Sequence, residues 1–317
     1  MRLNRIILIS LAALSAVACN KNNGDHTPSV TSHINVVASV DTPTRAGYDA
    51  DNLPGNFYLT VVQDPDDANS EYNYIDVQVT KGEGNTYHAA TDLLWKGSPL
   101  SDLEVYAYTA TGETFVVMKK QHLPGYLEES DLLGASLRHV GGEDITLNDN
   151  EVNVKFRHLL CKLDVTFTWD ESLDGLDKEV TGVLYRGFGE DVTLNRLTGV
   201  AVAGDNTFDI HAYLSASEGN KTYLSEAIFA PQTSDMSLLV NATIGGVEKE
   251  YVLNLMPPTG GFVPGNAYTM NVRISKEVLY LSTAPTLQDW EIGDELVFEK
   301  DEPVFTFTAH VDNSETK

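Results

Sequence analysis

The stretch Ile34-Asn35-Val36-Val37-Ala38-Ser39-Val40-Asp41 determines how the rest of the chain is interpreted. Apolar residues at 34, 36, 38 and 40 recur with a period of two, which predicts a β-strand with one buried face. Near the other end, Phe305-Thr306-Phe307-Thr308-Ala309-His310-Val311-Asp312 aligns with this stretch without a gap and has apolar residues at the same positions. Two segments with one pattern suggest that both fit the same groove.

A basic residue follows the first of these segments. In Thr42-Pro43-Thr44-Arg45-Ala46-Gly47, a Pro and a Gly bracket Arg45 and favour the open, extended loop that a protease needs. The simpler interpretation is a surface turn with one charge. With the repeated pattern, the Arg45–Ala46 bond predicts that cleavage removes a placeholder strand and that a donor strand replaces it. The placeholder residues are Ile34, Val36, Ala38 and Val40, and the donor residues are Phe305, Phe307, Ala309 and Val311.

Residues 1–19 are typical of a lipoprotein signal peptide. Two arginines precede an apolar run over residues 6–17, which is too short to span a bilayer. The run ends in Ala16-Val17-Ala18-Cys19, which resembles a bacterial lipobox although Ala16 replaces the usual Leu. Ordinary cleavage after Ala18 is the alternative. Because no other stretch is long and apolar enough to be a transmembrane helix, we expect attachment to the outer membrane through a lipid on Cys19.

Composition excludes some classes of function. The 317 residues include 21 basic and 46 acidic ones, a net charge of -25, which argues against binding to the phosphates of nucleic acids. Gly, Thr and Val are frequent and long helical periodicities are missing, so the chain is predicted to be mainly β. Many short strands separated by turns indicate antiparallel β-sandwiches.

An acidic, loop-like segment at 170–177 lacks a core pattern and is the expected domain boundary. The predicted organisation therefore has four parts. They are a signal peptide (1–19), a propeptide with the placeholder strand (20–45), an N-terminal β-sandwich domain (46–172) and a C-terminal β-sandwich domain (173–317) whose donor-strand tail covers about 303–312.

Several local elements are also predicted. Tyr72–Thr80 alternates, with Ile75, Val77 and Val79 together on one face of the predicted strand. Leu127–Ala135 favours a short helix or helical turn that ends near Gly134. Residues 152–169 are expected to form two strands or one bent strand. Gly245-Gly246 predicts a hairpin turn, and Trp95 is expected in the core.

No pattern of an enzyme is present in the sequence. We find no Ser-His-Asp arrangement, zinc-ligand spacing or phosphate-binding loop, and no cofactor or metal is expected. Cys161 follows Leu159-Leu160 and is interpreted as a small buried hydrophobic residue. A catalytic thiol would need a histidine beside it, and strand alternation would place His158 on the opposite face from Cys161.

Further motifs carry a resemblance to a known family. They are the leader with Cys19, the Arg45–Ala46 bond, Phe156-Arg157-His158-Leu159-Leu160-Cys161-Lys162-Leu163, Phe262-Val263-Pro264-Gly265-Asn266-Ala267-Tyr268 and Asp289-Trp290-Glu291-Ile292-Gly293. In this order and spacing the chain resembles the fimbrillins, the lipoprotein-precursor pilins of type V (Bacteroidales-type) fimbriae. The weak lipobox and the lone cysteine at 161 depart from the family pattern.

The resemblance implies two transthyretin-like antiparallel β-sandwich domains in tandem. It also implies export as an outer-membrane lipoprotein precursor and cleavage by an arginine-specific protease. Polymerisation by donor-strand exchange with other copies or related pilins, arranged head to tail, then gives an extracellular fimbrium for adhesion. Because a cut site and a donor segment are both present, we expect a shaft subunit. The alternatives are a monomeric surface lipoprotein and a fimbrial tip or anchor adhesin, either of which would bind glycans or host proteins.

Overall fold

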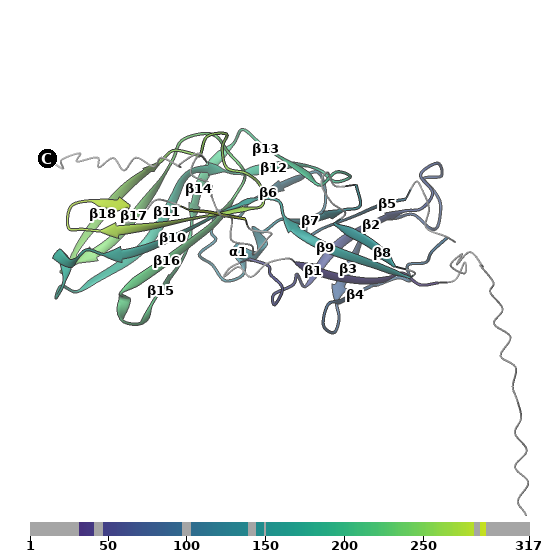
Figure 1. The fold of residues 1–317 in the computed structure, drawn as a ribbon, viewed down its shortest axis with the longest axis horizontal. Coiled ribbons are helices and arrows are strands. Elements are labelled where there is room, and N and C mark those ends of the chain that lie inside the picture. The colour runs from purple at the N-terminus through teal and green to yellow at the C-terminus, as the bar shows by residue number, and fades with distance from the viewer. Residues whose placement is uncertain are drawn as a thin grey trace, which may run out of the picture.

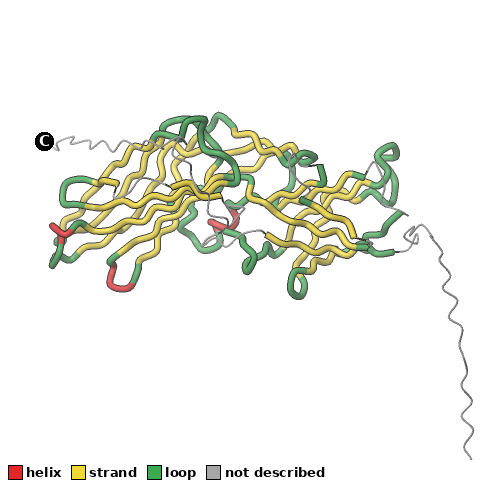
Figure 2. Tube along the Cα trace, viewed as in Figure 1, coloured by secondary structure: helices red, strands yellow, loops and turns green. Residues whose placement is uncertain are grey.

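The structure is a computed structural model that describes residues 32–40, 47–96, 103–138, 144–148, 150–281 and 286–289. Within these residues the protein is mainly β, with 21 strands and three short helical segments (Figures 1 and 2). The helical segments are α1 (Tyr126–Glu129) and two 3-10 turns, Glu171–Leu173 and Glu218–Asn220. None of the described helices has the length and apolar composition needed to cross a membrane.

The first sheet has eight strands and closes on itself. Its order is β1-β4-β3-β2-β5-β7-β9-β8, and β1 also pairs with β9, so β1 joins the β4 end of the row to β9. The strands are β1 (Asn35–Val40), β2 (Asn56–Val62), β3 (Tyr74–Lys81), β4 (Thr86–Ala89), β5 (Glu104–Tyr108), β7 (Leu133–Ser136), β8 (Ile145–Asn148) and β9 (Glu151–His158).

Three further sheets follow. A six-stranded sheet contains β10 (Cys161–Trp169), β15 (Tyr213–Ala216), β16 (Thr222–Phe229), β19 (Asn266–Ile274), β20 (Leu279–Leu281) and β21 (Thr286–Asp289). A four-stranded sheet contains β11 (Lys178–Gly189), β14 (Thr207–His211), β17 (Met236–Ile244) and β18 (Val247–Leu255). A three-stranded sheet contains β6 (Thr114–Val116), β12 (Asp191–Asn195) and β13 (Val200–Ala203).

The sheets occupy different parts of an elongated molecule. The first sheet lies at one end, the six- and four-stranded sheets lie at the other, and the three-stranded sheet lies between them (Figure 1). Two separate groups of buried apolar residues match this division. One fills the first sheet with residues from Ile34 to Phe156, and the other packs between the remaining sheets.

The chain passes from the first buried core to the second between β9 and β10, before the boundary expected near residue 172. β10 pairs with β16 and β19, and Leu163, Val165 and Phe167 on one of its faces belong to the second core. The pairing is also not purely antiparallel, since β1 runs parallel to β9 and β10 runs parallel to β19. The acidic segment at 170–177 is therefore a connection inside the second part of the molecule.

One strand has its apolar residues on a different face from the expected one. Ile75 was expected on the same face as Val79, but Ile75 is 59% exposed whereas Val79 is buried. The cause is a bulge at Asp76, where φ is +50° and the pairing of β2 with β3 gains one residue on the β3 side. The extra residue reverses the side-chain alternation before it, so the period-two prediction for Ile75 was wrong.

Other local predictions are confirmed in whole or in part. Residues 152–169 contain two strands, β9 and β10, and Trp95 is fully buried. Gly245 and Gly246, with φ values of +59° and +80°, form the two-residue turn between β17 and β18. The helix at 127–135 is shorter than expected, because β7 begins at Leu133. At Gly134 in β7, an added Cβ would lie 2.4 Å from the Tyr108 ring.

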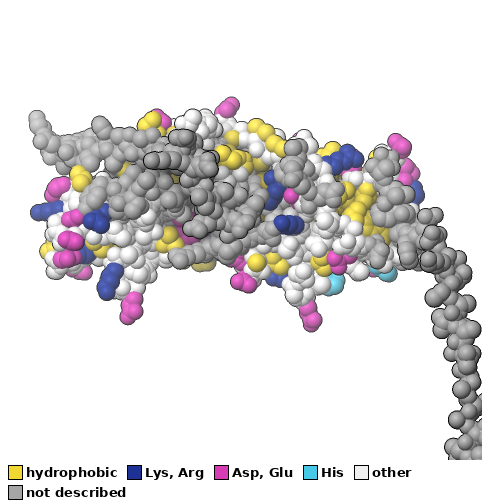
Figure 3. All heavy atoms as spheres, in the orientation of Figure 1, with side chains coloured by type: hydrophobic (Ala, Val, Ile, Leu, Met, Phe, Trp, Pro, Cys, Tyr) yellow, Lys and Arg dark blue, Asp and Glu magenta, His cyan; other side chains and the backbone are white. Residues whose placement is uncertain are grey.

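The visible surface is mixed in character. On the face shown in Figure 3, acidic and basic side chains are scattered over the described residues and hydrophobic side chains form small separate groups. The large apolar side chains are mostly inside, since residues such as Trp95, Tyr108 and Tyr185 are fully buried. Burial of apolar surface is the main source of stability for such a fold.

Candidate functional site

The candidate site is the space between β4 and β9 that β1 fills, which we call the β1 slot. β1 pairs in parallel with β9, from Asn35 opposite Glu151 to Val40 opposite Phe156. On its other side it pairs antiparallel with β4 at only two positions, Val36 with Tyr87 and Val37 with Thr86. Among the described residues, no other strand joins β4 to β9.

Backbone hydrogen bonds hold β1 on both sides. The amide of Asn35 donates to the carbonyl of Asn150 at 2.7 Å, and the amide of Ala38 donates to the carbonyl of Asn85 at 2.9 Å. Just before β1, the amide of Ile34 donates to Leu93 O at 2.8 Å. β1 is therefore fully inserted as a strand, with a neighbour on each edge.

The inward side chains of β1 are buried in the first core. Ile34, Val36, Ala38 and Val40 are 7%, 3%, 1% and 2% exposed. Beneath them lies a group of aromatic rings, in which Phe57 is 4.7 Å from Tyr87 and 5.0 Å from Phe156 between ring centroids. Each fully buried side chain of Val or Ile size contributes about 1.5–3 kcal/mol. A strand taken out of the slot would therefore expose an apolar trough.

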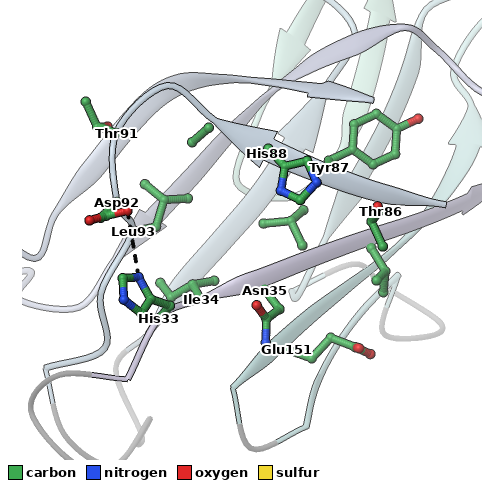
Figure 4. A pocket seen from close by; sticks show the side chains of 13 residues that line it. His33, Ile34, Asn35, Thr86, Tyr87, His88, Thr91, Asp92, Leu93 and Glu151 are labelled. Carbon is green, nitrogen blue, oxygen red and sulfur yellow. Dashed lines mark ion pairs between the residues drawn. The ribbon is translucent and has the colours of Figure 1, made fainter. Parts of the chain in front are cut away.

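A hollow of about 460 Å³ opens beside the first half of β1 (Figure 4). It forms because β4 pairs with β1 only at Thr86 and Tyr87. Further along the chain, Leu94 forms an isolated β-bridge with His33, just before β1. The lining of the hollow includes Ile34, just before β1, Val36 in β1 and His88 in β4. The His33–Asp92 pair at its rim is 3.8 Å long and highly exposed, so it contributes little.

Gly47 and Tyr48 lie next to a buried polar pair. The amide of Tyr48 donates to Asp131 Oδ2 at 2.9 Å, and Asp131 Oδ1 lies 2.9 Å from His158 Nδ1, with both side chains fully buried. Gly47 has φ of +93°, and an added Cβ would lie 2.7 Å from Asp131 Oδ2. Burial and the nearby carboxylate of Asp131 raise the pKa of the Tyr48 phenol to about 12. Asp131 thus holds the segment that follows residues 41–46.

Cys161 and His158, the two residues considered for a catalytic thiol, are both buried. Cys161 is buried, its thiol donates to Val263 O at 3.2 Å, and burial raises the pKa of the thiol well above its usual value. His158 contacts Asp131 rather than Cys161. Within the described ranges, no group of three or more His, Cys, Asp and Glu side chains is arranged to hold a metal ion.

Several predicted site residues lie outside the described residues. They are Cys19, Arg45, Ala46, Phe305, Phe307, Ala309 and Val311. The placeholder residues Ile34, Val36, Ala38 and Val40 are described, and the structure brings them together on one face of β1. Sequence reasoning did not identify their partners on β4 and β9, because pairing between residues about 50 to 120 positions apart leaves no local pattern.

Comparisons with known proteins agree on one family. The family model described as Fimbrillin-like matches residues 44–290. No curated protein has a sequence significantly similar to the chain.

Crystal structures of three candidate cell adhesion proteins share the fold. The protein from Bacteroides uniformis is 20% identical, with a TM-score of 0.54 over 82% of this chain and 98% of its own. The protein from Bacteroides ovatus is 17% identical, with a TM-score of 0.56 over 83% and 99%. The protein from Bacteroides fragilis is 15% identical, with a TM-score of 0.51 over 84% and 100%.

Proposed function

Because the chain belongs to the fimbrillin-like family, we propose that it is a pilin that polymerises on the cell surface by exchange of the strand in the β1 slot. In this proposal the chain is exported as a lipoprotein through Cys19 and cut between Arg45 and Ala46 by an arginine-specific protease. β1 then leaves with residues 20–45, and a donor strand from another copy or a related pilin takes its place. The role is structural and adhesive rather than enzymatic.

The observation that carries this proposal is the position of β1. It is a short strand at the N-terminal end of the described chain, it is buried on one face, and it joins β4 to β9. Its loss would leave two unpaired strand edges and an apolar trough, which together form a ready site for another strand. Because neighbouring strands lie about 4.8 Å apart, the gap between β4 and β9 has room for one strand.

The C-terminal segment has the pattern that this slot requires. In the gapless alignment, Phe305 and Phe307 replace Ile34 and Val36, while Ala309 and Val311 match Ala38 and Val40. The larger Phe side chains fall where the hollow of about 460 Å³ lies beside β1. Ala309 falls where Ala38 packs, only 1% exposed. We expect the donor to run parallel to β9, as β1 does, and to fill the slot more fully than β1.

The geometry of the tail favours exchange between copies. β21 ends at Asp289, which pairs with Asn266 in the second half of the molecule. Residues 290–302, when extended, reach about 45 Å before the donor segment begins. Because the slot belongs to one subunit and the donor belongs to the next, the contact is head to tail and produces a filament rather than a closed dimer.

The finer organisation is part of the same proposal. We propose two transthyretin-like β-sandwich domains, with the signal peptide at 1–19, the propeptide at 20–45 and the donor strand near 303–312. The change of core between β9 and β10 supports a boundary close to residue 160. A monomeric surface adhesin is the second candidate, favoured by the shared fold of the three candidate cell adhesion proteins.

The direct test is the substitution Arg45→Ala in cells that assemble the protein. We expect the variant to reach the surface with its leader processed but to remain monomeric, because β1 stays in the slot. Electron microscopy of the surface and mass spectrometry of the mature N-terminus are the measurements. Arg186→Ala, at an exposed position of β11, is the matched control and should assemble normally. Normal filaments from Arg45→Ala would end the proposal.

A second test removes the donor. Deletion of residues 304–311 should give subunits that are cut before Ala46 but do not form polymers, because the slot of the next copy stays empty. Size-exclusion chromatography of the surface material measures this. Unaltered polymers would place the donor elsewhere, and a mature N-terminus upstream of Ala46 in the unmodified protein would favour the monomeric adhesin.

A further inference from the structure

The turn between β12 and β13, residues Arg196–Gly199, reaches from the three-stranded sheet to the first sheet. Arg196 Nη1 donates to Asp76 Oδ2 at 2.8 Å, and Arg196 Nη2 lies 2.5 Å from Asp76 Oδ1, which makes a two-point ion pair. The guanidinium carbon of Arg196 also lies 5.3 Å from the ring centroids of Tyr106 and Tyr108. The planar guanidinium of arginine can contact both oxygens of a carboxylate and also interact with aromatic rings, a combination that the point charge of lysine does not reproduce.

Carbonyl groups of the same turn accept further hydrogen bonds from the first sheet. Tyr108 donates its hydroxyl to Arg196 O, and Ser136 donates its hydroxyl to Leu197 O. Arg157 donates from Nη2 to Gly199 O at 2.8 Å. The turn therefore contacts four strands of the first sheet, namely β3, β5, β7 and β9.

Uncommon backbone geometry supports two of these contacts. Asp76 has φ of +50° in the bulge of β3, where its amide donates to Thr60 Oγ1 at 3.0 Å. Gly199 has φ of +67°, and an added Cβ would lie 2.5 Å from Arg157 Nη2. The left-handed conformation is unfavourable for Asp76 and persists there because the surroundings determine it strongly, whereas a glycine at position 199 adopts it without strain. The Arg196 side chain is 11% exposed and the Asp76 side chain is 33% exposed, so the ion pair is partly shielded from water.

The contacted strands flank the β1 slot on both sides. β9 forms one wall directly, and β3 is hydrogen-bonded to β4, which forms the other wall. Arg157 follows Phe156, which lies opposite Val40 at the end of β1. The turn is thus fixed to both sides of the slot without contacting β1 through any of these bonds.

We infer that the Arg196–Gly199 turn is a brace that keeps the slot one strand wide when β1 is absent. Without β1, the row from β4 to β9 is an open sheet with two free edges, which can spread, close or fray. The brace ties four of its strands to the second half of the molecule, so the empty slot stays ready for a donor strand. This inference rests on the proposed function, since it concerns the subunit after β1 has left.

Hydrogen exchange on the full chain tests the brace. The substitutions Val36→Asp and Ala38→Asp place two charges in the apolar slot and should expel β1, whereas Asn35→Asp and Ser39→Asp add the same charge on its outer face. Arg196→Ala is then combined with the expelled form, and Arg186→Ala is the matched control. Mass spectrometry follows amide exchange in β5 and β7, which lie away from the slot walls.

We expect Arg196→Ala to speed exchange in β5 and β7 about tenfold or more when β1 is expelled, and Arg186→Ala to leave it unchanged. With β1 in place, Arg196→Ala should lower the melting temperature by only about 5 °C. Equal exchange in the Arg196→Ala and Arg186→Ala forms would overturn the inference. Should Arg196→Ala fail to fold even with β1 in place, Arg196→Lys replaces it, since lysine keeps the charge but not the two-point contact.

A peptide of residues 303–315 separates this inference from the proposed function. Added to the form with β1 expelled, the peptide should slow exchange in β4 and β9 if it enters the slot. Failure of the peptide to do so counts against donor-strand exchange. The comparison of Arg196→Ala with Arg186→Ala decides the role of the brace in either case, because it needs no donor.

Discussion

β1 and β10 hold equivalent places in the two halves of the molecule. Each lies between a parallel neighbour and an antiparallel neighbour, β9 and β4 for the first and β19 and β16 for the second. The two strands differ in how many residues pair with the antiparallel neighbour. β1 pairs with β4 at two positions, whereas β10 pairs with β16 at every position from Cys161 to Thr168.

Their polar contacts differ as well. Lys162 of β10 is 1% exposed, and its Nζ lies 2.9 Å from Glu226 Oε1 on β16 and 3.1 Å from Asp164 Oδ1. The outward residues of β1 are Asn35, Val37 and Ser39, which carry no charge. The comparison teaches that the same strand position is held by many pairings and a buried ion cluster in one half and by few pairings on one edge in the other. We expect β10 to leave only on global unfolding and β1 to leave locally.

The largest effect is expected from Lys162→Ala. This substitution removes the Lys162 ammonium from the carboxylates of Asp164 and Glu226, which are 21% and 3% exposed, and should lower the free energy of unfolding by about 3–5 kcal/mol. Urea denaturation followed by circular dichroism is the measurement. Lys120→Ala at an exposed position is the control and should change stability by less than about 0.5 kcal/mol. A change below about 1 kcal/mol for Lys162→Ala would show that the ion cluster does not fix β10.

The second prediction compares equal substitutions in the two strands. Val165 in β10 and Val36 in β1 are 0% and 3% exposed. Val165→Ala should lower the global free energy of unfolding by about 2 kcal/mol, because it removes two methyl groups from the core. Val36→Ala should instead speed amide exchange mainly in β1, β4 and β9. Equal global loss in both variants, without local exchange around β1, would contradict an exchangeable strand.

The smallest expected effect is at alkaline pH. Burial raises the pKa of Tyr87, in the wall of the slot, to about 12. The folded state then binds a proton that the unfolded state releases near pH 10, so this stability is present below pH 10 and is lost as pH rises towards 12. Between pH 9 and 11 we expect a loss of about 1 kcal/mol from Tyr87. Urea unfolding should show that the free energy of unfolding falls less steeply with pH for Tyr87→Phe than for the unmodified protein. Identical pH profiles for the two proteins would refute the assignment of this loss to Tyr87.

The second half of the molecule should also weaken at high pH, but through a different group. Burial opposes the charge on Lys162, yet the carboxylates of Asp164 and Glu226 outweigh that effect and raise the pKa of the amine. The stability from this raised pKa is therefore complete below the usual lysine pKa and is lost as pH rises through the folded value.

Local patterns predicted much of the secondary structure. Alternation identified β1 and the pair β9–β10, and two adjacent glycines identified the β17–β18 turn. Alternation gave the wrong face for Ile75, because the bulge at Asp76 depends on contacts with Thr60 and Arg196, which lie in distant parts of the chain. The boundary near residue 172 stays a prediction, because the strand pattern of β10 does not show which of the two cores its apolar face packs into.

By itself the sequence determined that the chain is mainly β and that residues 35–40 form a strand with one apolar face. Only the tertiary structure decided that this strand joins β4 to β9, that Arg196 lies against Asp76, and that Lys162 is buried with two carboxylates. The physical reason is the range of the interactions. Alternation and turn chemistry act over a few residues, whereas strand pairing, bulges and buried ion pairs join residues that meet only when the chain has folded.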